Sequence, residues 1–141
     1  YLGDGLMPTF GTPVAGDRDA RNALACARAM IEVMDRWNLE RRRAGEPEIR
    51  AGIGVHFGPA VLGDIGANRL EFAVVGTSVN VAARLEALTR PLAARLVISD
   101  AARKQVLLET GGACAGLDGL QRLPDQDIRG IDRPMTVWRL D

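Results

Sequence analysis

Residues 70–89, with the sequence LEFAVVGTSVNVAARLEALT, constrain the fold of this chain more than any other stretch. An apolar run ends at Gly76 and is followed by Thr77 and Ser78, whose hydroxyl groups can cap the first turn of a helix. After them, apolar residues recur at the spacing of one buried helical stripe: Val81, Leu85 and Leu88. The stretch therefore predicts a strand, a tight glycine turn and a helix with one buried side.

Two polar residues of the predicted helix, Asn80 and Arg84, are four positions apart and therefore share a face. A guanidinium group keeps its charge and offers several hydrogen-bond donors, so the pair suits an anionic ligand. The alternative is a solvated surface arginine beside an unrelated asparagine, which is the common situation for such residues. The ligand-binding interpretation of this pair becomes the better one only when the start of the chain is considered with it.

The chain opens with YLGDGLMPTFG, in which Gly3, Asp4 and Gly5 form a tight-turn signal. The two glycines permit the backbone angles of a two-residue hairpin, which leaves the carboxylate of Asp4 at its tip. Residues 6–10 are expected to form the second arm of this hairpin. An Asp-Gly pair by itself is more often a plain turn than a metal site.

Four segments together carry a specific resemblance: GDGLMPTFG, GIGVHFGPAVLGDIG, EFAVVGTSVNVAARLE and DIRGIDRPMTVWRL. This pattern resembles the catalytic domain of class III nucleotidyl cyclases, the adenylate and guanylate cyclases. The resemblance spans the whole chain, and VNVAARLE is its most specific part. The chain is therefore expected to be one domain, residues 1–141, that lacks the family's first strand and helices.

The order of the expected elements predicts an α+β sandwich in which helices pack on one face of an antiparallel-rich sheet. The resemblance agrees, because the family has a ferredoxin-like core. A long helix is expected from Asp17 or Asp19 to about Ala44, ended by Gly45 and Pro47. Its inward side should carry Ala20, Leu24, Ala27, Ile31, Met34 and either Trp37 or Asn38.

The remaining elements are a short helix at residues 100–109 and strands at residues 49–57, 70–75, 96–99, 120–123, 127–131 and 136–140. Residues 58–69 should form an extended excursion, which in the family is an arm that helps dimers form. The glycines of GIGVHFG do not match the dinucleotide-binding pattern GxGxxG, and close packing of the long helix on the sheet explains them better. His56, the only histidine, is interpreted as structural because the sequence shows no catalytic partner for it.

Composition excludes several functions. The chain has 18 Lys plus Arg and 18 Asp plus Glu, so no basic surface that would attract nucleic acid is expected. No apolar run is long enough to cross a membrane. Cys26 and Cys114 are too isolated for a disulfide or a metal site and are interpreted as reduced thiols. These features indicate a cytoplasmic domain, either free or as the cytoplasmic part of a membrane-attached protein.

The resemblance implies a specific reaction, in which the 3′-hydroxyl of a purine nucleoside triphosphate attacks its own α-phosphate and pyrophosphate leaves. Two Mg²⁺ or Mn²⁺ ions would serve this displacement, and Asp4 matches the second of the family's two metal aspartates. Arg84 matches the arginine that stabilises charge on the α-phosphate, and Asn80 matches the asparagine that positions the ribose. The substrate-binding positions are Arg129, where the family usually has a lysine for the terminal phosphates, Ala73 and Gly3.

Two departures from the family pattern matter. Ala73 stands where adenylate cyclases usually carry aspartate or threonine, and its methyl group cannot hydrogen-bond a purine. The choice of base is therefore open, with ATP favoured over GTP by the rest of the pattern. The first metal aspartate has no counterpart in the chain, so the 141 residues alone are expected to be inactive or nearly so.

The resemblance also implies a homodimer with two shared active sites, because the family takes the metal ligands from one subunit and the asparagine and arginine from the other. An upstream regulatory or sensor domain is expected as well. A competing hypothesis is a catalytically silent nucleotide-binding or dimerisation module, which Ala73 and the missing aspartate favour. The retained Asp4, Asn80 and Arg84 argue against that hypothesis.

Overall fold

The computed structural model describes residues 5–64, 72–114 and 116–141. Its helices and strands follow one another in the order α1 (Asp19–Arg43), β1 (Ile53–Val55), β2 (Val61–Asp64), β3 (Phe72–Val75), α2 (Thr77–Leu88), β4 (Leu96–Ser99), α3 (Asp100–Glu109), β5 (Gln121–Gln126) and β6 (Met135–Leu140). Within these residues, no helix is both long and apolar enough to cross a membrane.

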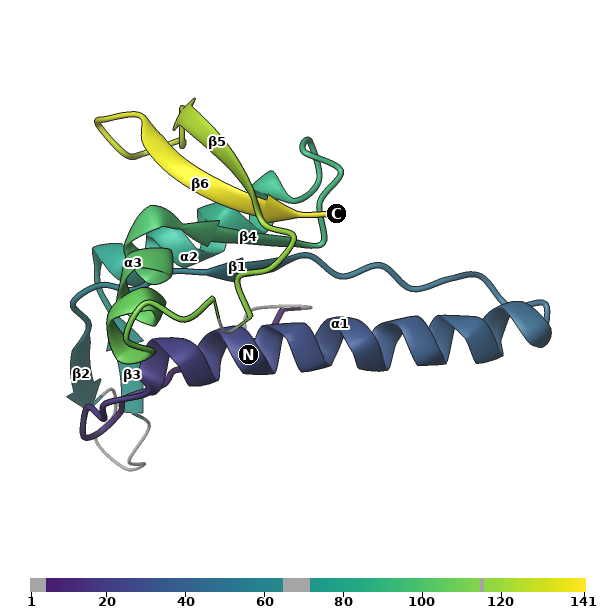
Figure 1. Ribbon diagram of the computed structural model, residues 1–141, viewed down its shortest axis with the longest axis horizontal. Coiled ribbons are helices and arrows are strands. Elements are labelled where there is room, and N and C mark those ends of the chain that lie inside the picture. The colour runs from purple at the N-terminus through teal and green to yellow at the C-terminus, as the bar shows by residue number, and fades with distance from the viewer. Residues whose placement is uncertain (1–4, 65–71, 115) are drawn as a thin grey trace.

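The described strands form a four-stranded sheet and a separate two-stranded sheet (Figure 1). The larger sheet has the order β1-β4-β6-β5, in which β1 and β4 are parallel and the other neighbours are antiparallel. β2 and β3 form an antiparallel pair that projects from the rest of the molecule, with Val61 opposite Val75. The predicted α+β fold with an antiparallel-rich sheet is confirmed.

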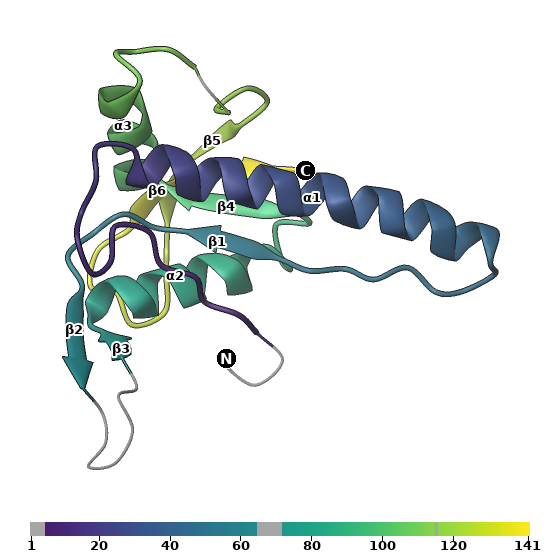
Figure 2. The same cartoon turned by 90° about the horizontal axis from the view of Figure 1, so that it is seen from below.

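The side chains of β4 show how the helices are distributed over the larger sheet. Leu96 and Ile98 pack with α1 and α3, whereas Val97, which points the other way, packs with α2. Figure 2 accordingly shows β1 between α1 and α2. The prediction placed the helices on one face of the sheet. Helices α1 and α3 follow it, and α2 covers the opposite face.

Helix α1 has the predicted length and the predicted buried stripe, which consists of Ala20, Leu24, Ala27 and Ile31. Of the two residues predicted for the next inward position, Asn38 faces inward. Its side-chain amide bonds the backbone N–H and C=O of Ile49 at 2.9 and 2.8 Å. Trp37 is 47% exposed, where the second half of α1 extends past the sheet. The helix stops before Gly45, which has a φ of +72°.

The start of α1 is stabilised differently from the prediction. Arg18 occupies the N-cap position and makes no side-chain capping bond, and Asp19 accepts a hydrogen bond from a backbone amide three residues earlier. The amides of Ala20 and Arg21 donate to the carboxylate of Glu109, at 3.1 and 2.7 Å. These amides have no partner within the helix, so the carboxylate at the end of α3 supplies the cap.

Two predicted strands are wrong or too long. Residues 6–10 have no strand conformation, and Pro8 among them lacks the N–H that a strand pairing needs. The strand predicted at residues 49–57 is limited to Ile53–Val55. The backbone of Ile49, at the start of the predicted range, bonds the side chain of Asn38 in α1 instead of a neighbouring strand.

The end of the chain forms two strands where three were predicted. β5 reaches Gln126, and its pairing with β6 shifts register after Leu123. Residues 127–131 form a turn instead of a strand, with a hydrogen bond of 2.9 Å from Ile131 N to Ile128 O. The chain has to reverse here so that β6 can return antiparallel to β5.

Replacing Leu85 with alanine is expected to lower the free energy of unfolding by about 2–5 kcal/mol. The Leu85 side chain is fully buried in a cluster with Val97 and Val137 on the α2 side of the sheet. Denaturant unfolding measures the loss. Leu108→Ala is the control, because Leu108 is 76% exposed and its loss should change stability by less than about 0.5 kcal/mol. Equal losses in the two variants would contradict this assignment of the core.

Candidate active site

Helix α2 begins directly after β3, and Gly76 makes the connection. Gly76 is the N-cap residue and has a φ of +138°, which residues with side chains rarely adopt. No side chain caps α2, so the capping role predicted for Thr77 or Ser78 is wrong. The hydroxyl of Ser78 instead donates to the carbonyl oxygen of Pro59 at 2.6 Å. This bond ties the start of α2 to the loop that follows β1.

Three sides of α2 have different environments. Val81 and Leu85 are buried in the core, and the backbone at Glu86 lies against β1. Asn80 and Arg84, four residues apart as predicted, are exposed. Arg84 takes part in none of the ion pairs that the described residues form. An amide and a guanidinium group are therefore open to a ligand on one side of this helix.

Arg129 is exposed in the turn between β5 and β6. The residue before it, Ile128, is buried in the same cluster as Val81 and Leu85 of α2. The turn therefore packs against α2, and Figure 2 shows the connection between β5 and β6 passing beside this helix. This packing brings the segment of Arg129 to the helix that carries Arg84, although spacing along the chain gave no sign of it.

The other predicted site residues are placed only in part. Ala73 belongs to β3, directly before α2, and its backbone pairs with Gly63 of β2. Gly3 and Asp4 lie outside the described residues. In the part of the chain that the structure describes, no three His, Cys, Asp or Glu side chains come together in a group that could hold a metal ion. The metal site therefore stays a prediction that depends on Asp4.

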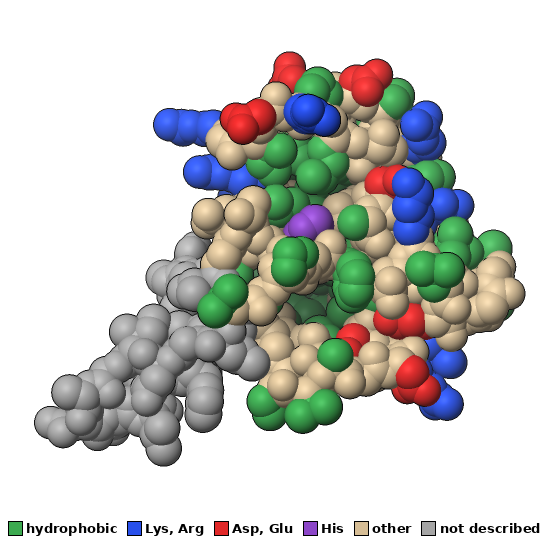
Figure 3. Space-filling view, turned by 90° about the vertical axis from the view of Figure 1, so that its left-hand side faces the viewer, with side chains coloured by type: hydrophobic (Ala, Val, Ile, Leu, Met, Phe, Trp, Pro, Cys, Tyr) green, Lys and Arg blue, Asp and Glu red, His purple; other side chains and the backbone are tan. Residues whose placement is uncertain are grey.

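His56 follows β1 and connects it to α3. Its Nδ1 lies 2.8 Å from the Oγ of Ser99, which is buried at the end of β4. The same Oγ accepts a hydrogen bond from Ala102 N at 3.1 Å and so caps α3. Figure 3 shows the histidine among hydrophobic side chains on this face of the molecule. The bond to Ser99, 43 residues away in sequence, supports a structural role for His56.

Burial lowers the pKa of His56 below its ordinary value of 6.5. The folded protein therefore binds this proton less readily than the unfolded chain. The stability that depends on neutral His56 is complete above pH 6.5 and is lost as the pH falls through the folded pKa. We expect the free energy of unfolding to decrease from about pH 7.5 to about pH 5, and to decrease less in His56→Gln. Denaturant titrations at both pH values measure this, and an unchanged pH dependence in the variant would contradict it.

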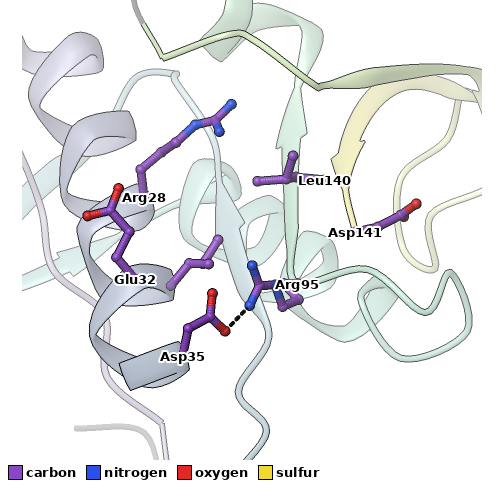
Figure 4. A pocket seen from close by; sticks show the side chains of 7 residues that line it. Arg28, Glu32, Asp35, Arg95, Leu140 and Asp141 are labelled. Atoms are coloured by element: carbon purple, nitrogen blue, oxygen red, sulfur yellow. Dashed lines mark hydrogen bonds and ion pairs between the residues drawn. The ribbon is translucent and has the colours of Figure 1, made fainter. Parts of the chain in front are cut away.

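A separate pocket of about 260 Å³ is lined by Arg28, Ile31, Glu32, Asp35, Arg95, Leu140 and Asp141 (Figure 4). Its arginines already have partners, because Arg95 pairs with Asp35 and Arg28 donates to the carbonyl oxygens of Gly116 and Asp118. The pocket lies against α1, on the side of the sheet opposite α2. It is therefore not part of the candidate site.

The larger sheet, the projecting pair of strands and the exposed polar pair on α2 together agree with the catalytic domain of a nucleotidyl cyclase. Residues 1–110 match the model of the family described as the adenylate and guanylate cyclase catalytic domain. The chain therefore belongs to this family, and the resemblance found in its motifs is confirmed.

Similar proteins include two bacterial adenylate cyclases. Adenylate cyclase 1 of Rhizobium meliloti (strain 1021) is 38% identical over 102 residues, which are 72% of this chain and 15% of that protein. The adenylate cyclase of Anabaena cylindrica is 36% identical over 147 residues, which cover 99% of this chain and 27% of that protein. The chain therefore spans about a quarter or less of the length of these relatives.

Solved structures with a similar fold are also cyclases. The guanylyl cyclase Cya2 has a TM-score of 0.69 and 25% identity, over 92% of this chain and 61% of that chain. The adenylyl cyclase CyaB from P. aeruginosa has a TM-score of 0.71 and 22% identity, over 94% of this chain and 64% of that chain. These likenesses confirm the ferredoxin-like cyclase fold.

Proposed function

We propose that this domain converts ATP, in preference to GTP, into the 3′,5′-cyclic nucleotide and pyrophosphate for signalling. The observation that carries this proposal is the exposed pair Asn80 and Arg84 on α2, in a chain that belongs to the cyclase family. The adenylate cyclases among the relatives support ATP as the substrate.

The proposed roles follow from the chemistry of the side chains. As the 3′-oxygen attacks the α-phosphate, negative charge increases on the phosphate oxygens, and the Arg84 guanidinium stabilises it. The Asn80 amide holds the ribose so that the attacking oxygen stays in line with the leaving pyrophosphate. Arg129, on the turn that packs against α2, binds the terminal phosphates. Ala73 makes no hydrogen bond to the base, so other groups select the purine.

The proposal includes two divalent cations, Mg²⁺ or Mn²⁺, with the Asp4 carboxylate as one of their ligands. When bound, they would act as Lewis acids on the phosphate oxygens. The described residues offer no cluster of side chains that could replace Asp4. Because the 141 residues contain no counterpart of the family's first metal aspartate, we expect little activity from this chain alone.

The proposed active form is a homodimer with two equivalent sites. Each site combines Asp4 and Gly3 of one subunit with Asn80 and Arg84 of the other. The exposure of Asn80 and Arg84 supports this arrangement, because a second subunit can reach them from solvent. An upstream regulatory or sensor domain and a cytoplasmic location complete the proposal.

The test is an assay of cyclic nucleotide formation by an N-terminally extended form of the chain, with Mn²⁺ and either ATP or GTP. We expect cyclic AMP to form faster than cyclic GMP. A faster reaction with GTP would correct the substrate, and the enzyme class would stand. Binding of both triphosphates without any turnover would instead favour the silent nucleotide-binding module.

A further inference from the structure

Two glycines of the strand segment, Gly52 and Gly54, leave room for helix α2. A Cβ atom on Gly54 would lie less than 3.0 Å from the backbone oxygen of Ala82 and the backbone nitrogen of Glu86. A Cβ atom on Gly52 would collide with the Oγ1 atom of Thr89 and would lie 3.0 Å from the Cβ atom of that residue. Neither glycine has a positive φ, so conformation does not require glycine here, and close approach of the helix does.

The side of α2 that touches these glycines lies opposite the candidate active site. The backbone atoms nearest to Gly54 belong to Ala82 and Glu86. Asn80 comes two residues before Ala82, and Arg84 comes two residues before Glu86. Two residues correspond to about 200° around an α-helix. A displacement of α2 away from β1 would therefore move the side chains of Asn80 and Arg84 farther from the sheet, in the direction in which they already point.

We propose that Gly52 and Gly54, which we call the glycine seat, are positioning residues for catalysis. They set the distance between α2 and the sheet, and this distance determines where Asn80 and Arg84 stand. The inference rests on the proposed cyclase function. It adds to the proposed active site two residues that touch neither nucleotide nor metal: Gly54 in β1, and Gly52 directly before this strand.

The two glycines differ in what a methyl group would meet. At Gly54 the obstacles are backbone atoms of α2, which no side-chain change can remove. At Gly52 the nearest obstacle is the Oγ1 atom of Thr89, which alanine would remove, whereas the Cβ atom of residue 89 would stay 3.0 Å away. Thr89 is itself buried, and its hydroxyl donates to Glu86 O at 2.6 Å. On its core side α2 is held by Leu85, so added volume at the seat has to displace the helix.

Gly54→Ala in an N-terminally extended form of the chain is expected to lower kcat by about 10- to 100-fold and to change KM little, since small displacements of catalytic groups have such effects. The matched control is Val55→Ala, the next residue of β1, whose side chain packs on the opposite face with α1 and α3. This control should lose stability but keep a kcat close to that of the native chain. A native kcat in Gly54→Ala, or an equal loss in Val55→Ala, would overturn the proposal.

A second comparison uses the difference between the two glycines. Gly52→Ala should lower kcat, and Thr89→Ala should rescue part of this loss. The rescue is partial because alanine at position 89 lacks the Oγ1 atom but keeps the Cβ atom. Thr89→Ala should not restore Gly54→Ala, because backbone atoms cause that collision. Failure of the first rescue, or success of the second, would contradict the assigned contacts.

A readout without turnover separates this inference from the proposed function. In Gly54→Ala the backbone amide resonances of residues 77–88 should shift, while most resonances of α1 keep their native positions. Native resonances throughout α2 in the folded variant would overturn the seat, whether or not the native chain forms cyclic nucleotide. Absence of turnover in the N-terminally extended form without substitutions, together with shifted α2 resonances in the variant, would refute the cyclase function and leave the seat as a structural feature of α2.

Discussion

Replacing Arg84 with alanine is expected to lower kcat for cyclic nucleotide formation by about 100- to 1,000-fold, in an N-terminally extended form of the chain. The expected cause is the loss of positive charge beside the α-phosphate as the 3′-oxygen attacks. Stability should stay close to native, because the Arg84 side chain is exposed and its removal creates no cavity in the core. Steady-state kinetics with ATP and denaturant unfolding measure the two effects.

Arg90→Ala is the matched control for this substitution. Arg90 is an exposed arginine just beyond the end of α2 and pairs with Glu86 at 3.3 Å. Its removal should change kcat by no more than about threefold, because an exposed ion pair contributes little. Arg84→Lys should fall between the two, since lysine keeps the charge but loses the planar fork of donors. Equal effects at positions 84 and 90 would mean that Arg84 has no special role.

The helices of this domain could be predicted closely from the sequence because a helix depends on nearby residues. The buried stripe of α1 and the bounds of α3, Asp100–Glu109, agree with the predictions. What the sequence could not show is the cap of α1. The carboxylate of Glu109 that bonds its first amides is 88 residues from Arg21, and only the packing of α3 on α1 brings it there.

The strands were predicted less well because a strand exists only beside a partner. Residues 96–98 are apolar, Ser99 follows them, and all four residues are buried and form β4 as predicted. Residues 6–10 and 127–131 have apolar positions of the same kind, yet neither segment pairs as a strand in the described part of the chain. Pairing depends on where the chain turns, and a short apolar segment does not contain that information.

The candidate site shows the same division between local and distant information. The shared side of Asn80 and Arg84 follows from helical spacing, and the structure agrees. The glycines of GIGVHFG were correctly linked to close helix packing, but the wrong helix was chosen, because α2 approaches them and α1 does not. The choice depends on which face of the sheet each helix covers, and local spacing does not determine that face. Asp4 and Gly3 remain predictions from the resemblance.

The proposed homodimer has a consequence that substitutions in separate chains can test. If each site takes Asp4 from one subunit and Arg84 from the other, a dimer of two differently substituted subunits has one damaged site and one intact site. In the intact site, the subunit with Arg84→Ala supplies the native Asp4. The subunit with Asp4→Ala supplies the native α2. A chain that builds its whole site alone would have no intact site in such a dimer.

In an N-terminally extended form of the chain, mixing Asp4→Ala with Arg84→Ala is therefore expected to restore activity from near zero to about a quarter of the native value, because random pairing makes half of the dimers mixed and each has one working site. Differently tagged subunits show whether mixed dimers form. The control is a mixture of Asn80→Ala with Arg84→Ala. Both residues belong to the same helix, so neither site of that mixed dimer is complete and no recovery should occur. Recovery in the control, or none in the first mixture when mixed dimers are present, would rule out sites shared in this way.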